Sequence, residues 1–84
     1  MSAHDFIITY CWEGEDNVRV LYHGTDPPAK HLQLGDVFQL ADVNRFLHFE
    51  PSMNIRALII KESLTYSEID HLTHHHCVLR KIVA

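Results

Sequence analysis

Apolar and β-branched residues are concentrated near the N-terminus in two stretches, residues 6–12 and 18–22. Both stretches are rich in the aromatic and β-branched side chains that favour strands. The intervening residues, 13–17, are polar and include Gly14 and Asn17, which readily adopt the backbone angles of turns. This pattern predicts a β-hairpin.

The length of the turn sets the register of this predicted hairpin, with Ile8 opposite Tyr22, Tyr10 opposite Val20 and Trp12 opposite Val18. Side chains alternate between the two faces of a strand, so one face is almost entirely apolar. That face, which we expect to meet the core, comprises Phe6, Ile8, Tyr10, Trp12, Val18, Val20 and Tyr22. The other face, which includes Leu21, is mixed and is expected to be half exposed.

The middle of the chain has weaker signals. Consecutive prolines predict a loop over residues 24–30, and Leu34-Gly35-Asp36 predicts a turn that enters a strand at Val37. Residues 37–50 fit either one helical face or two short strands, 37–40 and 46–49, and the aromatic residues favour strands. Residues 51–54 read as a turn, and residues 55–61, apolar on both faces, read as a central strand.

The segment Thr65-Tyr66-Ser67-Glu68 matches the capping box that begins many helices. We therefore expect a helix over residues 66–75 with Ile69 and Leu72 facing inward, followed by a strand over residues 77–83. The predicted fold is α+β: a single domain, residues 1–84, with a small antiparallel β-sheet and one C-terminal α-helix packed on it.

Charge and length narrow the classes of function. The formal net charge is −4 and no basic stripe is present, which argues against nucleic-acid binding and favours a partner with a basic surface. A chain of 84 residues leaves little material for a deep catalytic cleft beside its core. The longest apolar run, residues 57–60, is too short to cross a membrane, and no signal peptide begins the sequence. Two cysteines are too few for the disulfide framework of a small secreted domain, so we expect a cytoplasmic protein with reduced thiols.

Histidines gather near the C-terminus, in the segment His71-Leu72-Thr73-His74-His75-His76-Cys77. On the predicted helix His71 and His75 lie one turn apart, which is the spacing that lets two imidazoles bind one metal ion. The alternatives are a purely structural role, because histidine is favourable in the last turn of a helix, and a response to pH. We favour the structural role and expect neither a metal nor a cofactor.

The segment Tyr22-His23-Gly24-Thr25, followed by Leu34-Gly35-Asp36, resembles the first NAD-binding motif of ADP-ribosyltransferases. The resemblance implies that His23 contacts the ribose of NAD. That family also has a second strand with an aromatic and a hydroxyl residue, for which residues 46–49 are a poor substitute, and a longer domain. The alternative is that His23 ends a hairpin strand and an ordinary turn follows.

The tip of the predicted hairpin combines a large aromatic residue with acidic ones: Trp12, Glu13, Glu15 and Asp16. An aromatic anchor supplies buried area, and carboxylates steer a basic partner. We therefore predict a small acidic, non-enzymatic protein-binding module that uses these four residues, of the kind that act as inhibitors or adaptors in phages and mobile elements. An ADP-ribosyltransferase-like fragment and a metal-binding module that uses residues 71–77 remain the alternatives.

Overall fold

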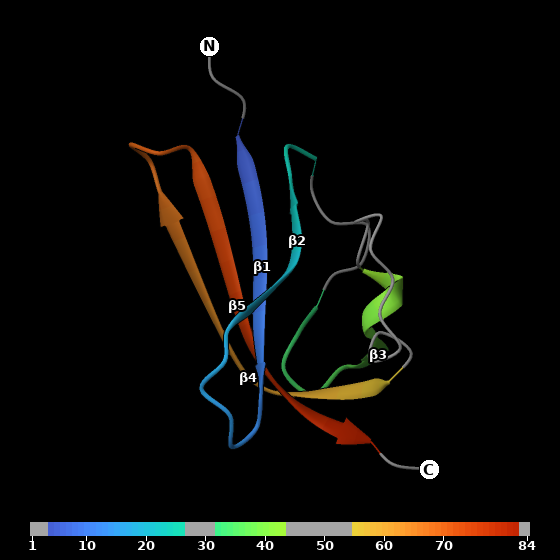
Figure 1. The fold of residues 1–84 in the computed structure, drawn as a ribbon. Coiled ribbons are helices and arrows are strands. Elements are labelled where there is room, and N and C mark those ends of the chain that lie inside the picture. The colour runs from blue at the N-terminus through green and yellow to red at the C-terminus, as the bar shows by residue number, and fades with distance from the viewer. Residues whose placement is uncertain (1–3, 27–31, 44–54, 83–84) are drawn as a thin grey trace.

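A computed structural model describes residues 4–26, 32–43 and 55–82. Within these residues five strands form one mixed sheet in the order β2-β1-β5-β4-β3. The elements are β1 (Asp5–Trp12), β2 (Arg19–Gly24), β3 (Val37–Gln39), the 3-10 turn η1 (Leu40–Asp42), β4 (Arg56–Ser67) and β5 (Leu72–Ile82). β1 and β5 are parallel, and the other neighbours are antiparallel. The sheet is strongly curled, and the lower parts of β4 and β5 turn toward β3 and η1 (Figure 1).

The bend in β4 coincides with a shift of register. Ile59 pairs with Leu79, but the next paired residue is Lys61, opposite Val78, so Ile60 is an extra residue in the ladder. Such a bulge bends a strand and increases its twist. The first part of β4 therefore curls beneath the core, while the remainder continues beside β5 (Figure 1).

The core is enclosed by the curled sheet. The largest fully buried side chains are Leu21, Leu40, Ile59, Leu79 and Cys77. They come from four elements, which shows that the sheet and η1 share one core. Burial of leucine and isoleucine is worth about 1.5–3 kcal/mol per side chain, so these residues are the main source of stability.

The predicted hairpin forms from β1 and β2, and the expected pair Ile8–Tyr22 is confirmed. A register shift between Ile8 and Thr9 then places Thr9, not Tyr10, opposite Val20. The expectation that Val18 and Val20 belong to the core was therefore wrong, since both are exposed. Leu21 takes their place and is completely buried.

The middle of the chain follows the predictions in part. The turn before Val37 and a strand starting there are confirmed, but that strand ends at Gln39 and residues 40–42 form η1. The strand predicted over residues 46–49 and the turn over 51–54 lie outside the described residues. The strand predicted over residues 55–61 is confirmed as part of β4, which continues to Ser67.

The predicted C-terminal helix is wrong, and with it the α+β class: residues 66–75 form the end of β4, a turn and the start of β5. The hydroxyl of Ser67 accepts a hydrogen bond from the backbone N–H of Asp70 at 3.2 Å and donates to the Asp70 carboxylate at 3.1 Å. His71 completes the turn with a positive φ of 50°. Side-chain capping thus closes a hairpin turn here, and β5 is held on both sides by strand pairing.

Candidate functional site

The outer side of β4 is only partly covered by the described residues. β3 pairs with Arg56–Leu58 alone. The backbone N–H of Ile59 donates a hydrogen bond to the carbonyl of Asp36, and the carbonyl of Ile59 accepts one from the N–H of Gly35. From residue 60 to 67, no strand among the described ranges pairs with this side, and we call this stretch the β4 edge. In Figure 1 it lies at the outer left of the sheet. Alternate residues of such a strand direct backbone donors and acceptors outward.

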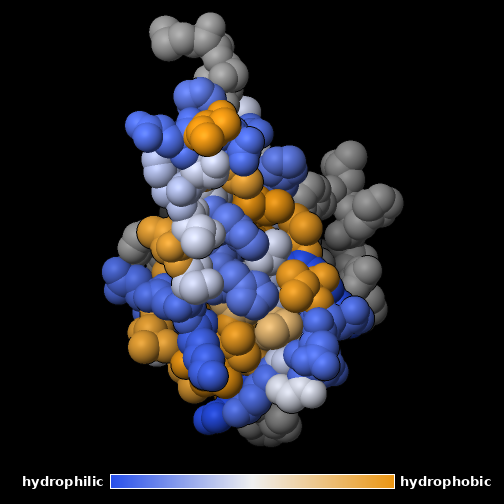
Figure 2. All heavy atoms as spheres, turned by 90° about the vertical axis from the view of Figure 1, so that its left-hand side faces the viewer, coloured by the Kyte–Doolittle hydropathy of each residue, from blue (hydrophilic) through white to orange (hydrophobic). Residues whose placement is uncertain are grey.

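A hollow of about 490 Å³ lies beside the β4 edge, and we call it the edge groove. It is lined by Leu32, Gln33, Leu34, Glu62, Leu64 and His75. The loop before β3 provides the first three residues and the sheet provides the rest. Leu64 is 69% exposed, and Leu34 is also exposed. Figure 2 faces this side of the molecule and shows hydrophobic surface interspersed with hydrophilic surface.

The polar groups of the edge groove form a pair. His75 Nε2 lies 3.1 Å from Glu62 Oε2, which is a hydrogen bond when His75 is neutral and an ion pair when it is protonated. Glu68 and Asp70 lie in the turn that follows the β4 edge, and Lys61 is the basic residue on the edge itself. Carboxylates therefore outnumber basic groups along this part of the described chain.

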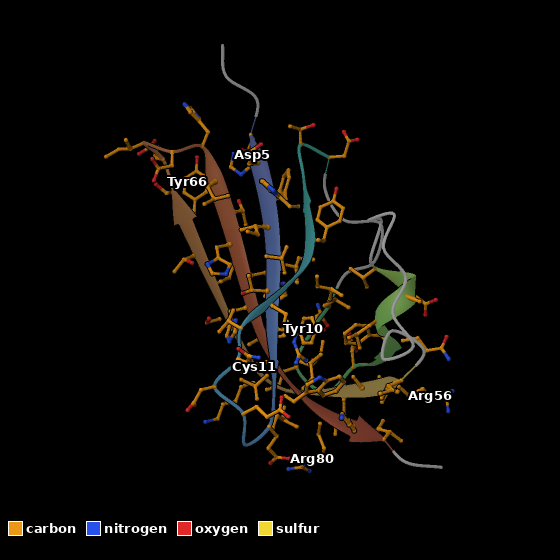
Figure 3. All side chains as sticks on the ribbon, viewed as in Figure 1. Asp5, Tyr10, Cys11, Arg56, Tyr66 and Arg80 are labelled. Carbon is orange, nitrogen blue, oxygen red and sulfur yellow. The ribbon has the colours of Figure 1, made fainter. Side chains whose placement is uncertain are left out.

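Two exposed apolar side chains continue the surface past the edge groove. Tyr66 is exposed near the end of β4, and Ile69 in the following turn is 92% exposed. The ring of His4 stacks on Tyr66 with centroids 5.5 Å apart, and His4 Nε2 lies 2.6 Å from Thr73 Oγ1. The ring of His4 therefore covers one side of the exposed Tyr66 ring. Figure 3 shows Tyr66 at this end of the sheet.

The predicted docking tip is only partly assembled. Trp12 is buried, with Tyr10 against it edge-on and Lys81 Nζ 5.1 Å from the ring centroid. The Glu13 carboxylate accepts hydrogen bonds from Arg80 Nε and Nη2 at 2.8 and 2.9 Å. Trp12, Glu13 and Glu15 border a shared hollow of about 200 Å³, of which Asp16, itself exposed, is not a lining residue. The tip as a docking point stays a prediction.

A titration of Glu13 tests whether the ion pair Glu13–Arg80 forms in solution. The Arg80 guanidinium lowers the pKa of Glu13 by hydrogen bonding and by its charge. A lowered pKa stabilises the fold above the ordinary carboxyl range, and the contribution is lost as the pH falls through the folded-state pKa. We expect Arg80→Gln to raise the pKa of Glu13 in an NMR titration of its side-chain carbon, whereas Lys81→Gln leaves it close to the wild-type value. An unchanged Glu13 pKa in Arg80→Gln would show that the pair does not form in solution.

Strand alternation divides the C-terminal histidines between the faces of the sheet. His75 faces the edge groove, whereas His74 and His76 contact Thr9 of β1, on the opposite face. His71 lies in the turn, so the predicted metal-binding spacing of His71 and His75 on a helix does not exist. In residues 4–26, 32–43 and 55–82, no group of three or more His, Cys, Asp or Glu side chains is placed to hold a metal ion.

The residues of the ADP-ribosyltransferase-like segment have local structural roles. The hydroxyl of buried Tyr22 donates to the carbonyl of Asp26 at 2.5 Å, and a Cβ on Gly24 would lie only 3.0 Å from that hydroxyl. Gly35 has a φ of +89° and donates its N–H to Ile59. His23 is an exposed strand residue opposite Ile7. These roles match those of the alternative, an ordinary strand end followed by turns.

Sequence reasoning missed the β4 edge because the capping box assigned its last residues to a helix. The signal was present, since Glu62, Leu64 and Tyr66 alternate with small polar residues as in a strand.

None of the described helical residues forms a segment long and apolar enough to cross a membrane. No protein-family model, curated protein or solved structure matches the chain.

Proposed function

We propose that this protein is a small acidic, non-enzymatic protein-binding module, an inhibitor or adaptor, that adds an extended segment of its partner to the β4 edge as a further strand. The observation that carries the proposal is a strand edge that pairs with none of the described strands and runs directly past the exposed side chains of Leu64 and Tyr66. In strand addition, main-chain hydrogen bonds give affinity and pockets for alternate side chains give specificity.

The chemistry of the edge groove defines the partner segment. Leu34 and Leu64 fit an apolar side chain, and the Glu62 carboxylate beside them fits a lysine or an arginine. The net charge of −4 attracts a basic partner and speeds its association. We therefore assign the occupant as an extended peptide with alternating apolar residues and at least one basic residue.

The composition of the β4 edge favours this use. Proteins protect exposed edges with bulges, prolines and charges, because bare edges pair with other chains. Here the bulge and the charges of Lys61 and Glu62 lie at one end of the edge. Residues 63–67 contain neither proline nor charge. An edge of this composition, beside a groove with apolar and polar residues and free of other described strands, is suited to binding a strand.

Both cysteines are free thiols in the structure, as is usual in a reducing compartment. We therefore propose a cytoplasmic location as well. The partner is a protein rather than a nucleic acid, because the chain has no basic stripe for phosphates.

Selection from a phage-displayed library of random peptides tests the proposal. We expect enriched peptides with apolar residues at alternating positions and a basic residue, and we expect binding to slow amide hydrogen exchange over residues 61–67. Leu64→Asp removes an anchor and is expected to weaken binding by about 30-fold, equivalent to about 2 kcal/mol. Val18→Asp is the matched control, since Val18 is similarly exposed at the far end of the hairpin, and it should leave binding unchanged.

Two outcomes would contradict strand addition. The first is a selection that enriches no peptide over the background. The second is a peptide whose binding protects residues 13–17 and is insensitive to Leu64→Asp, which would move the docking point to the hairpin tip.

A further inference from the structure

On the face of the sheet opposite the edge groove, four side chains from β1 and β5 form a continuous chain of contacts. Cys11 Sγ lies 3.8 Å from His76 Nε2, and His76 Nδ1 lies 2.8 Å from Thr9 Oγ1. Thr9 Oγ1 in turn lies 2.7 Å from His74 Nε2. The parallel pairing of β1 with β5 places Thr9 opposite His76, which brings these distant parts of the sequence together. Cys11 is labelled on β1 in Figure 3.

The hydrogen bonds of Thr9 restrict the protons of both imidazoles. Its hydroxyl has one hydrogen, so it donates to one imidazole nitrogen and accepts from the other. When Thr9 donates to His74, His76 donates from Nδ1 to Thr9, and its Nε2 is the unprotonated nitrogen facing Cys11. A neutral imidazole in this tautomer is a general base for the thiol. Thr9 is nearly fully buried, which holds the arrangement in place.

Space for a substituent on Cys11 lies beside His76. A hollow of about 200 Å³ is lined by Lys61, Glu62, Ser63, His76 and Val78, and Val78 is the residue paired with Cys11 across the two strands. The charged residues that line the hollow, Lys61 and Glu62, have opposite signs. A nucleophile and a base are therefore in contact, and the base, His76, also borders a hollow with room for a substituent.

We propose that Cys11 is a thiol-modification site that reacts with small disulfides, with His76 as the general base. Cys11 Sγ attacks one sulfur of the disulfide as its proton passes to His76 Nε2. The S–S bond of the small molecule breaks while a new S–S bond to Cys11 forms. The departing sulfur leaves as a thiolate and takes the proton from the His76 imidazolium. The Cys11 sulfur is oxidised to a mixed disulfide, and the leaving sulfur is reduced to a thiol.

The second cysteine is an internal control. Cys77 is fully buried on the core side of β5, and burial, with a contribution from the Glu62 charge, raises its pKa to about 12. The thiolate is the nucleophilic form, so Cys77 is inert in the folded protein. This proposal does not depend on strand addition at the β4 edge.

Reaction with oxidised glutathione at pH 7, followed by intact mass and peptide mapping, tests the proposal. We expect one adduct, on Cys11. His76→Ala should lower the rate constant by about 10-fold or more, and added imidazole should restore part of the rate. His71→Asn is the matched histidine control in the nearby turn and should react at the wild-type rate.

The positioning role of Thr9 has its own test, in which Thr9→Val slows the reaction and Thr9→Ser, which keeps the hydroxyl, restores it. The Thr9→Val and Thr9→Ser variants also test the role of the His76 base if His76→Ala does not fold. The proposal is overturned if wild-type protein forms no Cys11 adduct, if Cys77 reacts as fast as Cys11, or if neither His76→Ala nor Thr9→Val changes the rate.

Discussion

Leu21→Ala should lower the free energy of unfolding by about 2–5 kcal/mol, the range for a buried leucine truncated to alanine. Leu21 is completely buried, whereas its neighbour Val20 is 46% exposed. Val20→Ala is the matched control and should change the free energy of unfolding by only about 0.5 kcal/mol, as exposed positions do. Simple strand alternation predicts the opposite order, because it places Val20 in the core and Leu21 on the half-exposed face.

Urea denaturation of the two variants measures this difference. The midpoint should fall strongly in Leu21→Ala with an unchanged slope, which would indicate a change of stability without a change in the surface exposed on unfolding. A larger loss in Val20→Ala than in Leu21→Ala would show that the hairpin has the regular register and no bulge after Ile8.

The hairpin illustrates what local pattern can and cannot predict. Apolar density at residues 6–12 and 18–22 was sufficient to locate both strands and the pair Ile8–Tyr22. The bulge was not predictable, because Val20, Leu21 and Tyr22 are all apolar and any two of them could face the core. The choice is made by packing of the rest of the molecule, which the alternation of one hairpin does not contain.

The prediction for the C-terminal region failed for a different reason. The capping-box pattern at Thr65–Glu68 is a local signal, and residues Ser67 and Asp70 do form a side-chain cap, but around a turn. β5 gains backbone hydrogen bonds on both sides, and those with β1 come from a segment more than sixty residues earlier. Non-local pairing of this kind outweighs a helix propensity worth only tenths of a kcal/mol per residue.

The candidate sites depend on the same non-local pairing. Once β5 is a strand, the spacing of His74 and His76 places both on one face. Their contact with Thr9, and that of His76 with Cys11, requires the parallel register of β1 and β5, which no pattern in the sequence specifies. The edge groove likewise requires the loop at Leu32 and Leu34 to approach Leu64, which is a tertiary contact.

The strand assignment of the C-terminal region leads to a second prediction, on Leu79 and Ile69. Leu79 is fully buried in β5, where it pairs with Trp12 on one side and Ile59 on the other. We expect Leu79→Ala to lower the free energy of unfolding by about 2–5 kcal/mol. A domain of this size has a total of about 4–13 kcal/mol, so the variant loses a large part of its stability.

Ile69→Ala is the matched control because the two interpretations of residues 66–75 disagree about it. In the predicted helix Ile69 faces inward, and its truncation would also cost several kcal/mol. In the hairpin turn Ile69 is 92% exposed, so Ile69→Ala should leave the unfolding midpoint nearly unchanged. Thermal and urea unfolding of both variants decide between them. A loss in Ile69→Ala as large as that in Leu79→Ala would mean that Ile69 is buried in solution and that the turn between β4 and β5 is not the native structure.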